Sequence, residues 1–230
     1  MPGVDDGSPD AQTSLEMLRI AQKNNISHII LTPHHKPMHH NVSPDHNRLY
    51  TGKLQEILDK KEIDIRLFSG NEIYYSDETF RELEEGKICT MAGSDYVLVE
   101  FHPTNPYKAI HNAVFNVQAA GFVPIIAHVE RYSDIVSHPS YVDELVDMGA
   151  YIQVNASSIM GKYGFGISHF TKKLLKNRRV HFVATDAHDT DRRAPKLKEC
   201  YDYVSGKFGD GYASRLFYDN PMSIIRNEMI

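Results

Sequence analysis

The sequence is poor in cysteine and has no long apolar run, and both absences narrow what the protein can be. Its 230 residues include two cysteines, Cys89 and Cys200, which are too few for a disulfide framework or a four-thiolate zinc site. No stretch approaches the roughly 18 consecutive apolar residues of a membrane-spanning helix. Residues 1–24 also lack the layout of a signal peptide. We therefore expect a soluble, cytoplasmic protein with no membrane insertion.

The sequence also lacks an excess of positive charge. Its 25 Lys and Arg residues face 30 Asp and Glu residues, a formal net charge of -5, and no basic block stands out. Such a chain is a poor binder of nucleic acid. Internal repeats, low-complexity stretches and linkers are missing, so we expect a single domain over residues 1–230. Histidine is the abundant exception, with 13 residues.

Several catalytic motifs are absent as well. A thiol phosphatase needs Cys-x5-Arg, but the residue six positions after Cys89 is Asp95, and the residue six positions after Cys200 is Gly206. Neither a Gly-x-Ser-x-Gly elbow nor a His-Glu-x-x-His helix occurs. The glycine-rich segment 161–166 matches no phosphate-binding or dinucleotide-binding fingerprint, so we expect it to be a flexible loop.

Short apolar, β-branched runs are present at regular intervals and predict strands. Their apolar residues are consecutive rather than alternating, which is typical of parallel strands buried on both faces. Between them, a capping residue followed by proline marks the start of four helices. The predicted strands are 27–32, 65–70, 96–101, 123–128, 150–155 and 180–185, and the predicted helices are 9–24, 44–61, 106–120 and 139–148. This alternation predicts an α/β fold, either an open sheet or a barrel.

Polar side chains that can bind metals stand at the ends of these strands. Ligands meet at one switch point in an open sheet, whereas all strand ends meet on one face of a barrel, so this many polar ends favour a barrel. The strand-end residues are His34, Glu72, Glu100, the segment 128–131, Asn155, Asp186 and His188.

The chemistry of these residues points to a cation. An unpaired carboxylate is costly to bury, and Glu72 and Glu100 both close apolar strands. A bound cation removes that cost and also accounts for His128 and the Asp186-x-His188 pair, although His128 taken alone is better explained as a core histidine. Imidazole and carboxylate ligands without thiolate suit Mn, Fe, Zn or Mg, and bridging carboxylates allow a multinuclear cluster.

The other histidines near His34 receive a different interpretation. His34 directly follows a strand and is a candidate ligand, and His35 is undecided. We expect the remaining members of the run to be solvated surface residues; these are His39, His40 and His46.

Two arginines belong to the same predicted site. Arg131 lies three residues beyond His128, and Arg193 lies five beyond His188. Their guanidinium groups either neutralise the carboxylates or bind phosphate, whose oxygens match the planar fork.

Taken together, the chain resembles the PHP (polymerase and histidinol phosphatase) superfamily. More narrowly, it is similar to the manganese-dependent tyrosine phosphatases of capsule and exopolysaccharide clusters, the CpsB/YwqE type. The matching segments extend through nearly the whole chain: PGVDDGS (2–8), TPHH (32–35), GNEIYY (70–75), VEFHPTNPY (99–107), AHVERY (127–132), QVNASS (153–158), TDAHDTDRRAP (185–195) and DNP (219–221).

The resemblance implies a distorted (βα)7-type PHP barrel with up to three divalent metals, manganese first among them. It implies catalytic roles for Arg131 and Arg193. It implies metal ligation by Asp6, His34, Glu72, Glu100, His128, Asp186 and His188.

The match departs from the family at one place. The family has an Asp-x-His-x-His strand immediately before the PGVDDG segment, and this sequence opens at Met1-Pro2-Gly3. We therefore expect the first strand to be missing, a gap in the sheet, fewer than three tightly held metals and reduced activity.

The implied reaction is hydrolysis of a phosphomonoester without a covalent enzyme intermediate. The implied substrate is the phosphotyrosine tail of a bacterial tyrosine kinase that controls capsular or exopolysaccharide synthesis. Two alternatives stay open: a small-molecule phosphatase of the histidinol-phosphatase type, and a metal- or phosphopeptide-binding protein that loss of the first strand has inactivated.

Overall fold

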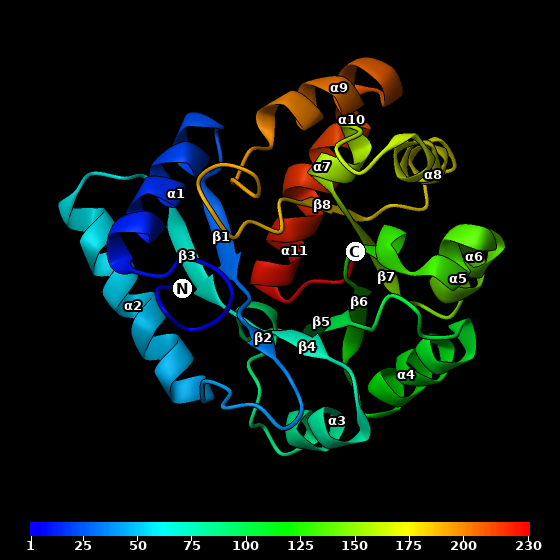
Figure 1. Cartoon of the computed structure of the whole chain (residues 1–230), viewed down its shortest axis with the longest axis horizontal. Coiled ribbons are helices and arrows are strands. Elements are labelled where there is room, and N and C mark those ends of the chain that lie inside the picture. Colours follow the sequence, from blue (N-terminus) through cyan, green and yellow to red (C-terminus); the bar gives the residue numbers. More distant parts are fainter.

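Parallel strands form the centre of the structure, a computed structural model that describes every residue from Met1 to Ile230 (Figure 1). The strands run along an open arc, and most helices lie on its outer side. The strands are β1 (His28–Leu31), β2 (His34–His35), β3 (Arg66–Ser69), β4 (Glu72–Tyr74), β5 (Tyr96–Glu100), β6 (Val123–Ile126), β7 (Tyr151–Asn155) and β8 (Phe182–Ala184). All six predicted strands are therefore confirmed.

Two short strands, β2 and β4, were not predicted, and each continues the strand before it. β1 pairs with β3, and β2 pairs with β4 within a second sheet of order β2-β4-β5-β6-β7-β8. Between β1 and β2 the chain contains Pro33, whose missing N–H interrupts the hydrogen bonding between the strands. The Asn71 side chain donates to the Pro33 carbonyl over 2.9 Å and bridges this break. The sheet therefore bends here, just before the residues of the predicted site.

The arc of strands does not close. β1 and β8 each pair with only one neighbouring strand, and no strand lies between them. A cavity of about 660 Å³ with a largely apolar lining opens at this gap, and its walls include Leu18, Ile29, Phe182 and Ile225. The structure is thus a curled parallel half-barrel, and the expected gap in the sheet is present.

The helices are α1 (Ala11–Lys23), α2 (Pro44–Lys60), α3 (Asp77–Glu84), α4 (Tyr107–Ala119), α5 (Ser133–Ser137), α6 (Ser140–Asp147), α7 (Ala156–Ile159), α8 (Phe165–Lys176), α9 (Lys198–Phe208), α10 (Asp210–Ser214) and α11 (Asn220–Arg226), with single-turn η1 (Met91–Gly93) and η2 (Val129–Arg131), and a π-helical segment η3 (Arg215–Asp219). The four predicted helices are present as α1, α2, α4 and α6, whereas α3, α5 and the helices after β7 were not predicted. No helix is both long and apolar enough to cross a membrane.

The start of α1 differs from the prediction. The prediction has Ser8 as the capping residue before Pro9, but Asp10 caps the helix instead, because its carboxylate accepts a hydrogen bond from the Thr13 N–H over 2.7 Å. Ser8 is instead buried against Ser14, with 2.5 Å between the two hydroxyl oxygens.

Apolar contacts hold the half-barrel on both of its faces. A cluster of 31 buried residues lies between the sheet and the outer helices, and a cluster of eight joins α1 and α2 to β1 and β3. A third cluster lies inside the curl, where Ile224 of α11 packs among residues of the strands. The C-terminal segment is anchored there by the Tyr96 hydroxyl, which donates to the Glu228 carbonyl over 2.9 Å.

Candidate active site

The structure brings the seven predicted ligand residues together at the carboxyl ends of the strands. The sheet register places His34 directly opposite Glu72, and Glu100 is the last residue of β5. His128 and Asp186 each follow a strand by two residues. Asp6 and His188 reach the same place from the loops after Met1 and after β8. Their convergence on one face is as the sequence predicts.

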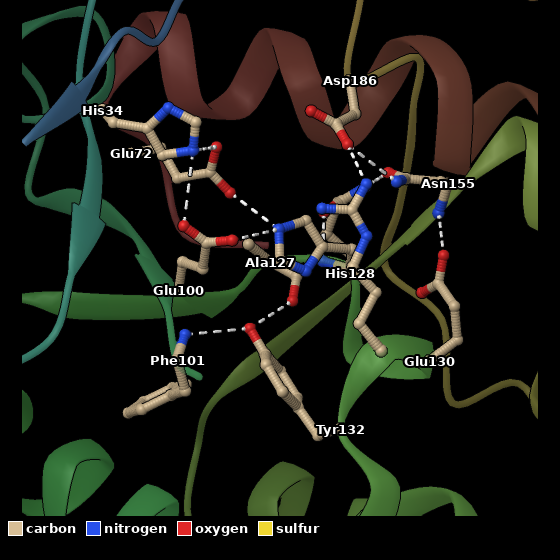
Figure 2. A network of polar contacts seen from close by, with 12 residues as sticks. His34, Glu72, Glu100, Phe101, Ala127, His128, Glu130, Tyr132, Asn155 and Asp186 are labelled. Atoms are coloured by element: carbon tan, nitrogen blue, oxygen red, sulfur yellow. Dashed lines mark hydrogen bonds and ion pairs between the residues drawn. The ribbon is translucent and has the colours of Figure 1, made fainter. Parts of the chain in front are cut away.

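Two carboxylates and two imidazoles form the buried part of this site (Figure 2). The Nε2 atom of His128 lies 2.9 Å from Glu72 and 3.3 Å from Glu100. The Nε2 atom of His34 lies 3.5 Å from Glu72 and 3.4 Å from Glu100. Each imidazole nitrogen therefore faces both carboxylates, so His34, Glu72 and Glu100 offer ligand atoms around one point.

A second group of ligand atoms lies on the solvent side of His34. One oxygen of Asp6 is 3.3 Å from Nδ1 of His34 and 3.2 Å from Nε2 of His188. These three residues can also hold one ion. Because His34 belongs to both groups, the two candidate ion positions are neighbours.

Asp5 is a site residue that the sequence analysis missed. Its carboxylate accepts from the backbone N–H of His34 over 2.7 Å and lies 2.5 Å from Nδ1 of the same residue. The motif pointed only to Asp6, although the adjacent Asp5 has the same chemistry. Asp5 fixes the ring of His34 and competes with an ion for Nδ1.

The clustered carboxylates need positive charge beside them. Burial lowers the pKa of His34, but Asp5, Glu100 and Glu72 raise it to about 10. Burial likewise lowers the pKa of His128, and its contacts with Glu100 and Glu72 raise it to about 9. Although burial raises the pKa of Glu100, the two imidazoles hold it below its usual range. Protons on the imidazoles thus balance the carboxylates, a role that a divalent cation also fulfils. The donor set, oxygen and nitrogen without thiolate, fits Mn, Fe, Zn or Mg.

Asp186 holds both predicted arginines. Arg131 forms an ion pair with one of its oxygens, and Arg193 lies 2.7 Å from the other. Burial raises the pKa of Asp186, but the two guanidinium groups lower it below its usual range. Both arginines remain about a third exposed, so part of each planar fork is free to meet a ligand.

Tyr132 supports the site from beneath and was also missed. Its buried hydroxyl accepts from the Phe101 N–H over 3.2 Å and donates to the Ala127 carbonyl over 2.9 Å (Figure 2). Phe101 follows Glu100 and Ala127 precedes His128, so this hydroxyl joins the backbones of two candidate ligands. Sequence spacing carries no signal for such a long-range contact.

The remaining predictions on single residues have mixed outcomes. His35 is buried and faces away from the site, with its Nε2 atom 2.7 Å from Glu82 of α3. His39, His40 and His46 are exposed as predicted, and His46 lies in the first turn of α2. The expectation that residues 161–166 form a loop is wrong at its end, since Phe165 already begins α8.

The site offers no thiol nucleophile. Cys89 and Cys200 are both buried. Burial raises the pKa of Cys200 to about 12 and also raises the pKa of Cys89, so neither forms a thiolate near neutral pH.

A comparison with known proteins bears on this geometry. A family model described as "Capsular polysaccharide synthesis, CpsB/CapC" matches residues 1–226. The chain belongs to the CpsB/CapC family. It is 32% identical over 232 residues to the tyrosine-protein phosphatase CpsB of Streptococcus pneumoniae, covering 99% of this chain and 96% of that protein.

Relatives in other organisms agree with this membership. The chain is 30% identical over 230 residues to the tyrosine-protein phosphatase YwqE of Bacillus subtilis, covering 100% of this chain and 90% of that protein. A crystal structure described as YwqE from Bacillus subtilis and CpsB from Streptococcus pneumoniae, "unique metal-dependent tyrosine phosphatases", matches with a TM-score of 0.92 and 30% identity over 100% of this chain and 92% of that one. The half-barrel of the present chain is therefore the fold of this family.

Proposed function

We propose that the protein is a metal-dependent tyrosine phosphatase that hydrolyses phosphotyrosine on a bacterial tyrosine kinase of capsular or exopolysaccharide synthesis. One observation carries the proposal: buried carboxylates and imidazoles converge beside two arginines that share Asp186. The family membership supports the same function. The cytoplasmic location expected from the sequence stays a prediction.

The two ligand groups suggest how the residues would divide between ions. Glu72, Glu100 and His128 would hold one ion, and Asp6, His34 and His188 would hold a second. Asp186 is the main ligand left for a third, and in the structure two arginines engage it. We therefore expect these residues to hold fewer than three ions tightly, with manganese as the first candidate.

The arginines and the leaving group account for the rest of the chemistry. Bound divalent ions would supply Lewis-acid activation of water near neutral pH at these residues. Arg131 and Arg193 would bind the phosphate oxygens and stabilise the charge that shifts onto them in the transition state. A tyrosinate has a parent pKa of about 10, so it leaves with less proton donation than a serine alkoxide needs.

The proposal is tested with the metal-free chain, prepared by chelation, and with added Mn²⁺. We expect turnover of para-nitrophenyl phosphate and of a phosphotyrosyl peptide to appear with Mn²⁺ and to vanish on chelation. The double variant Cys89→Ser/Cys200→Ser serves as the control and should keep its activity. Faster turnover of histidinol phosphate would favour the small-molecule alternative, and metal binding without any turnover would favour a binding protein. Metal analysis after dialysis counts the ions held per chain.

A further inference from the structure

Strand β7 ends at the site without contributing a predicted metal ligand. Its two last inward-facing side chains are the amides of Gln153 and Asn155, which lie two residues apart and therefore on the same face of the strand. Gln153 is 5% exposed and Asn155 is 1% exposed. A buried amide is costly unless its donors and acceptors have partners, so the partners of these two residues reveal their role.

The two amides link the candidate ligands on either side of β7. The backbone N–H of His128 donates to Oε1 of Gln153 over 2.6 Å, and Nε2 of Gln153 donates to Oδ1 of Asn155 over 2.8 Å. Nδ2 of Asn155 then donates to Asp186 over 3.1 Å (Figure 2). A continuous chain of three hydrogen bonds thus runs from the turn after β6 through β7 to the loop after β8.

The direction of this chain follows from its two ends. The backbone N–H of His128 can only donate, and the ionised carboxylate of Asp186 can only accept. Each amide between them must therefore turn its oxygen toward His128 and its NH₂ group toward Asp186. The aligned amide dipoles place their positive ends at the Asp186 carboxylate and stabilise its negative charge.

The residues at the two ends of this series of hydrogen bonds have an unusual backbone conformation. His128 has a φ of 30° and Asp186 has a φ of 50°, in the left-handed region that residues other than glycine rarely adopt. Such conformations persist where the surrounding contacts hold them, and they concentrate at functional sites. The amide chain supplies one of these contacts at each of the two residues.

We propose that Gln153 and Asn155 are positioning residues that hold the His128 backbone and the Asp186 carboxylate in the geometry needed for metal binding. This inference rests on the proposed function, in which His128 and Asp186 are ligands. An amide is the side chain that fits, because it donates to one neighbour and accepts from the other. An aliphatic side chain of similar size does neither. Partners of ligand residues are typically worth 10–100-fold in metal affinity or activity.

The test replaces each amide with leucine and measures Mn²⁺ binding to the metal-free chain by calorimetric titration, alongside kcat and KM for para-nitrophenyl phosphate. We expect Asn155→Leu and Gln153→Leu to weaken Mn²⁺ binding about 10–100-fold and to lower kcat by a similar factor. The control Thr171→Val removes a buried hydroxyl from α8, away from the site, and should leave both quantities unchanged.

The double variant separates positioning from a general loss of packing. If the amides act as one chain, Gln153→Leu/Asn155→Leu should lose no more Mn²⁺ affinity than the weaker-binding single variant, whereas independent packing losses would add. Circular dichroism and thermal unfolding of the metal-free variants verify that they fold. If Asn155→Leu does not fold, Gln153→Leu breaks the same chain at its other amide.

The results of these experiments distinguish failure of this inference from failure of the proposed function. Wild-type protein that binds Mn²⁺ and turns over substrate, together with variants of unchanged affinity, would overturn this inference alone. Additive losses in the double variant would overturn it as well. A wild-type chain that does not bind Mn²⁺ at all would overturn the proposed function, and this inference with it.

Discussion

The inward faces of the same strands differ sharply between their two ends. At the amino ends they present Tyr96, Tyr151 and Phe182, which pack in one apolar cluster inside the curl. Four residues further along the chain from each of these aromatic residues, the inward positions are Glu100, Asn155 and Asp186. Aromatic contact joins the first layer, with 5.7 Å between the ring centres of Tyr96 and Tyr151. Charge and hydrogen bonding join the second.

This difference shows that the amino ends of the strands contribute mainly to stability, whereas their carboxyl ends carry the candidate site. Buried apolar area stabilises the fold at the amino end, where Ile224 of α11 completes the cluster. At the carboxyl end, buried charges stabilise each other only as a complete set, and removing one leaves the others without a partner. Substitutions at the two ends should therefore have separable effects on stability and on activity.

The largest effect is expected for Glu72→Ala. Glu72 faces both His34 and His128, so its loss would affect more than one ligand position. We expect turnover of para-nitrophenyl phosphate to fall at least about 10³-fold, beyond the 10²–10³-fold typical of one lost oxyanion donor. Mn²⁺ content, measured in parallel, should fall as well. The control Glu82→Ala removes the carboxylate that contacts His35 on the other side of the strand and should retain activity. Full activity in Glu72→Ala would contradict the assignment of the site.

Arg131→Ala and Arg193→Ala should affect activity without affecting metal content. Each variant should lose roughly 2–4 kcal/mol of transition-state stabilisation, measured as the change in kcat/KM. Arg192→Ala is the matched control, since Arg192 is exposed beside Arg193. Loss of metal from both arginine variants would mean that they neutralise Asp186 and do not bind phosphate.

Ile224→Ala tests whether the apolar cluster at the amino ends of the strands contributes to stability. Ile224 is 3% exposed within the apolar cluster, and removing its side chain should lower the free energy of unfolding by about 2–5 kcal/mol. Urea titration measures this change, and kcat of the folded enzyme should stay within about twofold of wild type. Met229→Ala, at a side chain that is 91% exposed, should change neither. A large drop in kcat would show that the two ends are coupled.

The metal-free protein should lose stability at alkaline pH. The raised pKa values of His34 and His128 contribute stability that is present below the usual histidine pKa of about 6.5 and is lost as pH rises through 9 to 10. The change should be on the order of 2 kcal/mol because the imidazoles share the same carboxylates. On the acid side, the lowered pKa of Glu100 contributes stability that is lost as pH falls below its usual range.

Bound Mn²⁺ should remove this alkaline loss, because metal ligation requires both imidazoles to be neutral. Thermal unfolding between pH 5 and 10, with and without Mn²⁺, compares the two states. Equal pH profiles would show that His34 and His128 do not bind the ion. Mn²⁺ affinity itself should rise with pH over the same range.

The smallest effect is expected for Asn227→Gly, near the amino ends of the strands. The Asn227 side chain accepts from the Asp95 N–H over 2.9 Å, and its backbone has a φ of 53°. Glycine keeps this conformation and loses the hydrogen bond, so the cost should be about 1 kcal/mol. Asn227→Ala should cost more, since alanine also resists the left-handed conformation. Urea titration of both variants provides the comparison, and an equal cost would contradict the conformational argument.

The sequence predicted the strands and most of the residues that meet at the candidate site because both depend on local patterns. Apolar runs mark buried strands, and a strand's last residue must lie at the edge of the sheet whatever the rest of the chain does. Asp5, Tyr132 and Gln153 were missed because their roles depend on contacts between distant segments. The helices after residue 197 were also not predicted, although they close the interior of the curl.

The adjacent histidines of β2 have a consequence for deletions in the chain. His34 and His35 alternate across the strand, one toward the carboxylates and the other toward Glu82. A deletion of one residue just before them would bring His35 opposite Glu72, and the site would still meet an imidazole. A similar shift in the partner strand would replace Glu72 with Ile73, whose side chain cannot bind a metal ion. A one-residue deletion is therefore more tolerable just before His34 than just before Glu72, a rule that family members of different length in these segments can be used to examine.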